Sequence, residues 1–110
     1  MTDIELVSFK IISEVGTAKS FFMEAIAFAQ KNNFVKARKL IEEGENHRIL
    51  GHETHFELIQ KEASGEPLGI NLILMHAEDQ LMAAETIKIL AEQLIKSYEI
   101  INELAIQINK

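Results

Sequence analysis

His76 is the residue of this sequence best suited to chemistry, and it lies in residues 75–82, where polar residues interrupt apolar rows of a predicted helix. Neutral imidazole is a nucleophile near pH 7 and accepts a phosphoryl group on nitrogen. Asp79 and Gln80 follow three and four positions later, so on a helix all three side chains project from adjoining positions. The spacing therefore predicts a histidine nucleophile with a carboxylate and an amide beside it.

A purely structural interpretation of His76 competes with this one, since a histidine on an apolar row is often a hydrogen-bonded core or interface residue. The chemical interpretation has one firm consequence. The sequence contains no Gly-x-x-x-x-Gly-Lys or Gly-x-Gly-x-x-Gly loop that would hold a nucleotide. A phosphohistidine formed here must receive its phosphate from a phosphoprotein donor and pass it to an acceptor.

Asp79 also has two interpretations. In a monomer it would accept an ordinary hydrogen bond or form an ion pair. In a symmetric trimer three copies would surround one axis, where they would repel one another unless they were protonated or shared a cation. Carboxylate oxygens suit Mg²⁺, Ca²⁺ or Mn²⁺.

The other histidines carry weaker signals. His52 and His55 are three residues apart on a predicted helix, and His47 lies about a turn earlier. This spacing permits a shared zinc ion, although an isolated pair is more often part of a polar surface or interface. No Ser/His/Asp or Cys/His constellation can be assembled from the sequence.

Helical periodicity predicts three elements that would position these residues, over about 3–31, 34–63 and from about 70 or 71 to 107. Asn33 is the expected cap of the second helix, and the Gly/Pro segment 64–69 separates the second helix from the third. Apolar residues repeat along one face of the first helix: Ile4, Val7, Ile11, Val15, Ala18, Phe22, Ala25 and Ala29. These features predict one all-α domain over 1–110, an antiparallel three-helix bundle running up, down and up like a spectrin repeat.

The second and third helices carry more unusual rows. Ala37, Gly44, Gly51 and Leu58 repeat every seven residues, and the two glycines predict a close approach by another backbone. The third helix has two rows, which run through His76 and through Asp79. The first comprises Ile73, His76, Gln80, Ala83, Ile87, Leu90, Leu94, Ser97, Ile101, Leu104 and Ile108; the second comprises Leu72, Met75, Asp79, Met82 and Ile89. If one row faces the subunit's own core and the other a partner, self-association follows, and a coiled-coil trimer is one closed solution.

Composition narrows the class of protein. The net charge of −6, with scattered lysines and arginines, argues against binding to nucleic acid. There is no cysteine, which rules out disulfides and suits a cytoplasmic location. We see neither a signal peptide nor an apolar run long enough to span a membrane.

Residues 76–82 read His-Ala-Glu-Asp-Gln-Leu-Met, and further segments of one family pattern follow in order along most of the chain. They are residues 15–20 (Val-Gly-Thr-Ala-Lys-Ser), 24–26 (Glu-Ala-Ile), 37–40 (Ala-Arg-Lys-Leu), His52, 59–65 (Ile-Gln-Lys-Glu-Ala-Ser-Gly) and Tyr98. On these residues the chain resembles the IIA component of the lactose/cellobiose class of the bacterial sugar phosphotransferase system. Members of that family carry a motif like His-Ala-Gln-Asp-His-Leu-Met.

The resemblance implies a three-helix subunit that forms a homotrimer, with the active histidines at subunit boundaries. It implies that His76 accepts phosphate from the phosphocarrier HPr and passes it to a cysteine of the IIB component, which works with the membrane component IIC. The chain would then be a phosphotransferase component for uptake of a lactose-, cellobiose- or chitobiose-type disaccharide, without touching the sugar itself. Asp79, one from each subunit, would hold one Mg²⁺ or similar divalent cation per trimer, and Gln80 would contact the phosphate.

Three departures from the family pattern bear on activity. Glu78 and Gln80 stand where the family often has Gln and His, and residues 51–56 read Gly-His-Glu-Thr-His-Phe where it tends towards Ala-His-x-x-Gln-Thr. A carboxylate at Glu78 facing the phosphate would repel it by about 1–4 kcal/mol at 4 Å. Residue 78 is about 200° around the helix from His76, so the alternative is that it points away.

Two other functions remain open from the sequence. One keeps the fold and loses the activity, giving a regulatory or scaffolding relative that binds partners without carrying phosphate. The other is an unrelated helical oligomerisation module in which His76 and Asp79 only fix the register of the helices.

Overall fold

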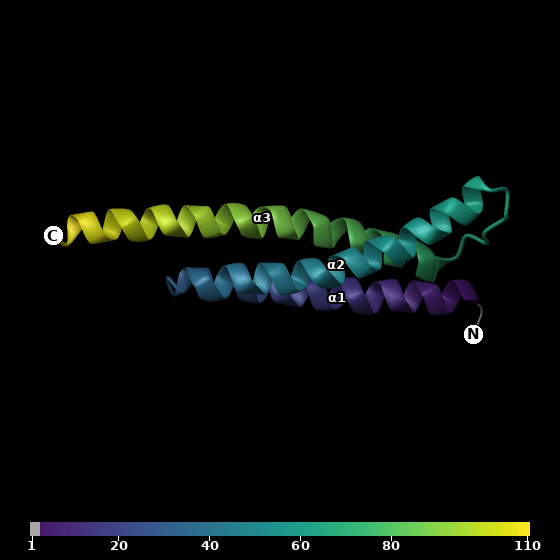
Figure 1. Ribbon diagram of the computed structural model, residues 1–110, viewed down its shortest axis with the longest axis horizontal. Helices are drawn as coiled ribbons and strands as arrows, with labels where there is room; N and C mark the ends of the chain where they lie inside the picture. The colour runs from purple at the N-terminus through teal and green to yellow at the C-terminus, as the bar shows by residue number, and fades with distance from the viewer. Residues whose placement is uncertain (1–2) are drawn as a thin grey trace.

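The computed structural model describes residues 3–110, which form three long helices: α1 (Asp3–Gln30), α2 (Phe34–Ala63) and α3 (Leu72–Ile108). Helices α1 and α3 run in the same direction and α2 runs back between their ends, so the predicted up-down-up bundle is confirmed (Figure 1). The bundle measures 65 × 23 × 20 Å, and no strand occurs in the part of the chain that the structure describes. The subunit is therefore a narrow rod with much surface and little core.

Side-chain caps fix where α2 and α3 begin. The side-chain oxygen of Asn33 accepts a hydrogen bond from the Lys36 amide at 3.3 Å, and that of Asn71 accepts one from the Leu74 amide at 2.9 Å. The predicted cap at Asn33 is confirmed, and α3 begins one or two residues later than expected. This cap at Asn71 sets the register of the whole first turn of α3.

Gly65 ends α2 with a left-handed backbone conformation, φ +96°. Its amide donates to the Glu62 carbonyl at 3.1 Å, and the Glu66 amide donates to the Lys61 carbonyl at 3.1 Å, which satisfies the last carbonyls of the helix. The loop that follows brings the chain back to the end of the bundle where α1 starts (Figure 1). The predicted break over 64–69 is thus confirmed.

Helix α1 provides the central row of the core. Its fully buried apolar residues are Ile11, Val15, Ala18, Phe22, Ala25 and Ala29, while Ile4 and Val7 are half-buried at its start. The predicted row on α1 is therefore confirmed. These residues pack against both other helices, so α1 holds the bundle together.

The glycines of α2 mark the closest approach between helices. A Cβ atom placed at Gly44 would lie 2.5 Å from Cε1 of Phe22, and one at Gly51 would lie 2.7 Å from Cγ1 of Val15. The predicted close approach is confirmed, with one refinement: side chains of α1 make the nearest contacts. Backbone carbonyl oxygens lie further off, that of Ala18 at 3.1 Å from a Cβ at Gly44 and that of Ile11 at 3.9 Å from one at Gly51.

The expectation for α3 was wrong in one respect, because the row buried in the subunit's own core is neither of the two predicted rows, although Ile87 of the first row packs against that core while half-buried. The buried residues of α3 form a third row beside the His76 row, on the side away from the Asp79 row: Leu74, Ala77, Leu81, Ala84, Ala91 and Ile95. The physical reason is size, since alanine lets α3 approach α1 closely even though it is a weak hydrophobic signal in the sequence. Both predicted rows are left at or near the surface.

The distal half of α3 is unusually apolar for an exposed surface. The C-terminal part of α3 extends past the turn between α1 and α2 (Figure 1). Its exposed large apolar residues are Leu90, Leu94, Ile100, Ile101, Leu104, Ile106 and Ile108. A group of exposed large apolar residues of this kind is typical of a contact with another molecule.

Candidate functional site

His76 is exposed on the second turn of α3, and its ring makes no hydrogen bond or ion pair with any residue in the range 3–110. The Asn71 cap and the buried neighbours Leu74 and Ala77 hold the backbone on either side of it. The interpretation of His76 as a buried histidine satisfied within its own subunit is therefore wrong. Neither ring nitrogen is blocked by a contact with the described chain, so another protein can reach the imidazole.

Gln80 lies one turn beyond His76 on the same side of α3 and is half-buried. Its side-chain oxygen accepts a hydrogen bond from Nζ of Lys19, which reaches across from α1. Periodicity in the sequence gave no indication of Lys19, because nothing local distinguishes it from a solvated lysine. The contact places an ammonium group within about one helical turn of His76.

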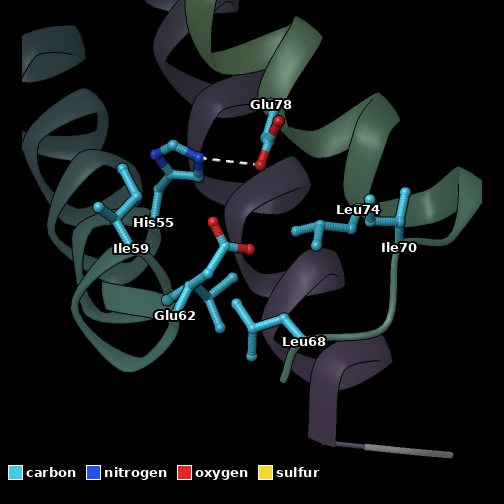
Figure 2. Close-up of a pocket in the computed structure, with 8 residues that line it drawn as sticks. His55, Ile59, Glu62, Leu68, Ile70, Leu74 and Glu78 are labelled. Carbon is cyan, nitrogen blue, oxygen red and sulfur yellow. Dashed lines mark ion pairs between the residues drawn. The ribbon is translucent and has the colours of Figure 1, made fainter. Parts of the chain in front are cut away.

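Glu78 points away from His76 towards α2, as the alternative for that residue predicted. Its Oε1 atom lies 3.2 Å from Nε2 of His55 (Figure 2). Glu78 and His55 both stand at positions where the chain departs from the family pattern, and the structure brings these two departures together. The repulsion between Glu78 and a phosphate on His76 therefore has no geometric basis.

The Glu78–His55 pair lines a cavity of about 260 Å³ at the end of the bundle where α2 and α3 diverge (Figure 2). Glu62 adds a second carboxylate, and the remaining walls are apolar: Leu58, Ile59, Leu68, Ile70 and Leu74. His76 does not line this cavity. The candidate nucleophile thus sits on an open surface rather than in a pocket, as a group must when another protein has to reach it.

Asp79 is exposed, and its carboxylate has no hydrogen bond or ion pair with the described chain. Its neighbours on the second row, Leu72, Met75 and Met82, are exposed apolar residues. Residues 3–110 contain no group of three or more histidine, aspartate or glutamate side chains that could hold a metal ion. One subunit therefore offers a cation at most the single carboxylate of Asp79 at this position.

The histidines of α2 each contact a different acidic residue. His47 Nδ1 lies 2.8 Å from Oε2 of Glu14, and its ring stacks on Phe21 at 5.6 Å between centroids. His52 Nδ1 lies 3.8 Å from Oε1 of Glu85. The structure offers the His52 and His55 pair no third ligand from residues 3–110, so the zinc hypothesis gains no support.

A separate charge cluster joins α2 to α3 in the middle of the bundle. Arg48 Nη2 lies 2.5 Å from Oε1 of Glu45, and Nζ of Lys88 lies 3.1 Å from Oε2 of the same carboxylate. The hydrogen bonds from Arg48 and, to a lesser degree, Lys88 hold the pKa of Glu45 below its usual range, against the opposing effect of partial burial. This cluster stabilises the α2–α3 contact and lies outside the surface around His76.

The fold and the exposed histidine together define an all-helical subunit with a candidate nucleophile on an open surface. Residues 6–99 match the family described as the lactose/cellobiose-specific IIA subunit of the phosphotransferase system. The chain belongs to this family of phosphotransferase components.

Individual relatives agree with that assignment. The chain is 39% identical to the lichenan-specific phosphotransferase enzyme IIA component of Bacillus subtilis over 101 residues, 92% of each chain. It is 36% identical to the lactose-specific EIIA component of Staphylococcus aureus, over 88% of this chain and 94% of that one.

Solved structures show the same bundle. The cellobiose-specific enzyme IIA from Bacillus anthracis superposes with a TM-score of 0.91 at 37% identity, covering 94% of each chain. The IIA(chitobiose) subunit of Escherichia coli, solved in solution as its complex with HPr, shares the fold with a TM-score of 0.80 at 24% identity. None of the helices within residues 3–110 has the length and apolar character needed to cross a membrane.

Proposed function

We propose that His76 is the phosphorylated residue of this IIA component, accepting phosphate from HPr and passing it to a cysteine of a IIB component. The observation that carries the proposal is the exposed, unpartnered imidazole of His76 on a well-fixed turn of α3. The related IIA(chitobiose) subunit was solved in complex with HPr, which supports HPr as the donor. Glu78 offers no reason to prefer a phosphate-free scaffolding role, because it pairs with His55.

In the proposed system the sugar is chosen by a component other than this chain. Relatives carry the names lactose-specific, lichenan-specific and oligo-β-mannoside-specific. We propose a lactose-, cellobiose- or chitobiose-type disaccharide as the sugar of the system, selected by the membrane component IIC. A cytoplasmic location is part of the same proposal, and a chain without cysteine suits that reducing compartment.

A homotrimer holding one Mg²⁺ or similar divalent cation is the second part of the proposal. Two exposed rows on α3 support self-association, since the core uses a third row and leaves apolar residues such as Met75, Met82 and Leu94 uncovered. Asp79 lies among them without a partner. Three symmetric copies would supply carboxylate oxygens of the kind that bind Mg²⁺, and the cation would offset their mutual repulsion.

Incubation with phosphoenolpyruvate, enzyme I, HPr and Mg²⁺, followed by intact mass measurement, tests the role of His76. We expect one acid-labile phosphate per chain, absent from His76→Ala and retained by the matched variant His52→Ala, whose imidazole is also exposed. A wild-type chain that gains no phosphate from a competent donor would overturn the proposal. Phosphate retained by His76→Ala would assign it to another residue.

A further inference from the structure

Lys19 stands out among the cationic side chains that bridge two helices. Three others contact carboxylates, since Arg38 pairs with Glu99, Arg48 with Glu45 and Glu85, and Lys88 with Glu45, while Lys36 of α2 lies over the Phe28 ring of α1. Lys19 extends from α1 to α3, and the partner it contacts there is the neutral amide oxygen of Gln80. Its positive charge is therefore not neutralised at this contact, which leaves it available to an anion.

The position of Lys19 relative to His76 follows from helix geometry. Gln80 and His76 are four residues apart on α3, so their Cβ atoms are separated by roughly 5–6 Å on one face. The Lys19 ammonium is hydrogen-bonded to the Gln80 side chain. The flexible four-carbon stem of the lysine would let the ammonium move by one helical turn, towards His76. A phosphoryl group on a ring nitrogen of His76 would place anionic oxygens in this space.

We propose that Lys19 binds the phosphoryl group carried by His76, with Gln80 holding the ammonium in place until the phosphate arrives. The inference rests on the proposed phosphorylation of His76. In that step a nitrogen–phosphorus bond forms at His76 as the bond to the donor phosphoprotein breaks, and the donor keeps the electron pair. Lys19 takes no part in the bond changes and contributes its positive charge alone.

In this arrangement Lys19 supplies the positive charge that Gln80 lacks, at a position where the family often has a histidine. An imidazolium at that position would carry charge only below its pKa, whereas a lysine near the surface stays charged well above pH 7. Gln80 supplies the neutral acceptor that holds Lys19 next to His76 without competing charge. The positive charge at this site thus comes from α1 instead of α3.

The ionisation of the phosphoryl group itself provides the test. A nearby cation favours the dianion and lowers its pKa, so removal of the cation raises that pKa. The experiment phosphorylates the wild type, Lys19→Met, Lys19→Arg and Lys39→Met, and follows the phosphohistidine signal by ³¹P NMR from pH 5 to 9. Lys39→Met is the matched control, because it removes the same positive charge as Lys19→Met. Lys39 is an exposed lysine on α2 in the other half of the bundle.

We expect the phosphoryl pKa in Lys19→Met to rise by about half to one unit, allowing for solvent screening at an open surface. Lys19→Arg and Lys39→Met should titrate like the wild type. An unchanged pKa in a phosphorylated Lys19→Met chain would overturn the role of Lys19 while leaving His76 as the acceptor. A wild type that takes up no phosphate would overturn both proposals, and Lys19→Gln replaces Lys19→Met if the latter fails to fold.

Discussion

His55 on α2 and Glu78 on α3 form an ion pair, with 3.2 Å between Nε2 and Oε1, at the end of the bundle where these helices diverge. The pair directs the Glu78 carboxylate away from His76, although only one residue separates them in sequence. Both residues replace glutamine in the family pattern, so the two departures compensate each other in space. Activity at His76 is therefore expected to be independent of the charge at residue 78.

Glu78→Gln tests that independence. A carboxylate facing the phosphate would slow transfer by about fivefold or more, on the basis of about 1–4 kcal/mol of repulsion. Because Glu78 faces His55, we expect the rate of phosphoryl transfer from HPr to change by less than about threefold, or 0.7 kcal/mol. Rapid-quench measurement with His55→Gln as a companion variant checks this. A tenfold acceleration in Glu78→Gln would show that the carboxylate acts on the phosphate after all.

Gly44→Ala and Gly51→Ala should both destabilise the subunit. The new methyl groups would collide with the buried side chains of Phe22 and Val15, and overpacking of this kind costs about 1–3 kcal/mol. Gly16→Ala is the matched control, since it lies in α1 with no atom within 4 Å of the added Cβ. Helix propensity there favours alanine by up to about 1 kcal/mol. Thermal unfolding should give lower midpoints for the first two variants and an equal or higher one for Gly16→Ala.

The Glu45 cluster predicts a specific contribution to stability at low pH. The folded-state pKa of Glu45 is held below its unfolded value, chiefly by the hydrogen bond from Arg48. Its contribution is therefore fully present above the unfolded pKa of about 4.3 and is lost as the pH falls through the lower folded value. Urea unfolding of wild type and Glu45→Gln should differ at pH 7, and the difference should shrink below pH 4. A difference that stays constant down to pH 2 would contradict this assignment.

Asp79→Leu should keep or strengthen the proposed trimer. The substitution removes three carboxylates that would repel one another and replaces them with side chains like those of the exposed neighbours Met75 and Met82. Sedimentation velocity in the presence and absence of EDTA is the measurement. We expect chelation to weaken the wild-type assembly and to leave the variant unaffected. A monomeric variant would place Asp79 away from the axis.

The sequence predicted the helices and the α1 row well, because both depend on local signals such as Asn33 and on a repeat of large apolar residues. It predicted the wrong facing row on α3, because alanines such as Ala77 and Ala84 carry little hydrophobic signal and gain their role from close packing. The direction of Glu78 stayed open for a similar reason, since its partner His55 lies on another helix. The sequence placed Lys19 in the family segment 15–20 but gave it no role, because its contact with Gln80 joins residues distant in sequence.

The alanine row of α3 couples the volume of the core to the position of His76. Ala77 is fully buried against α1, and the next residue back along the chain is His76. A larger side chain at Ala77 would push the first turns of α3 away from α1 and increase the distance between the His76 imidazole and Lys19. The same small residues set how far both outer rows stand from the bundle axis. Larger side chains in this row would therefore impair the proposed phosphoryl transfer and subunit assembly before they unfold the bundle.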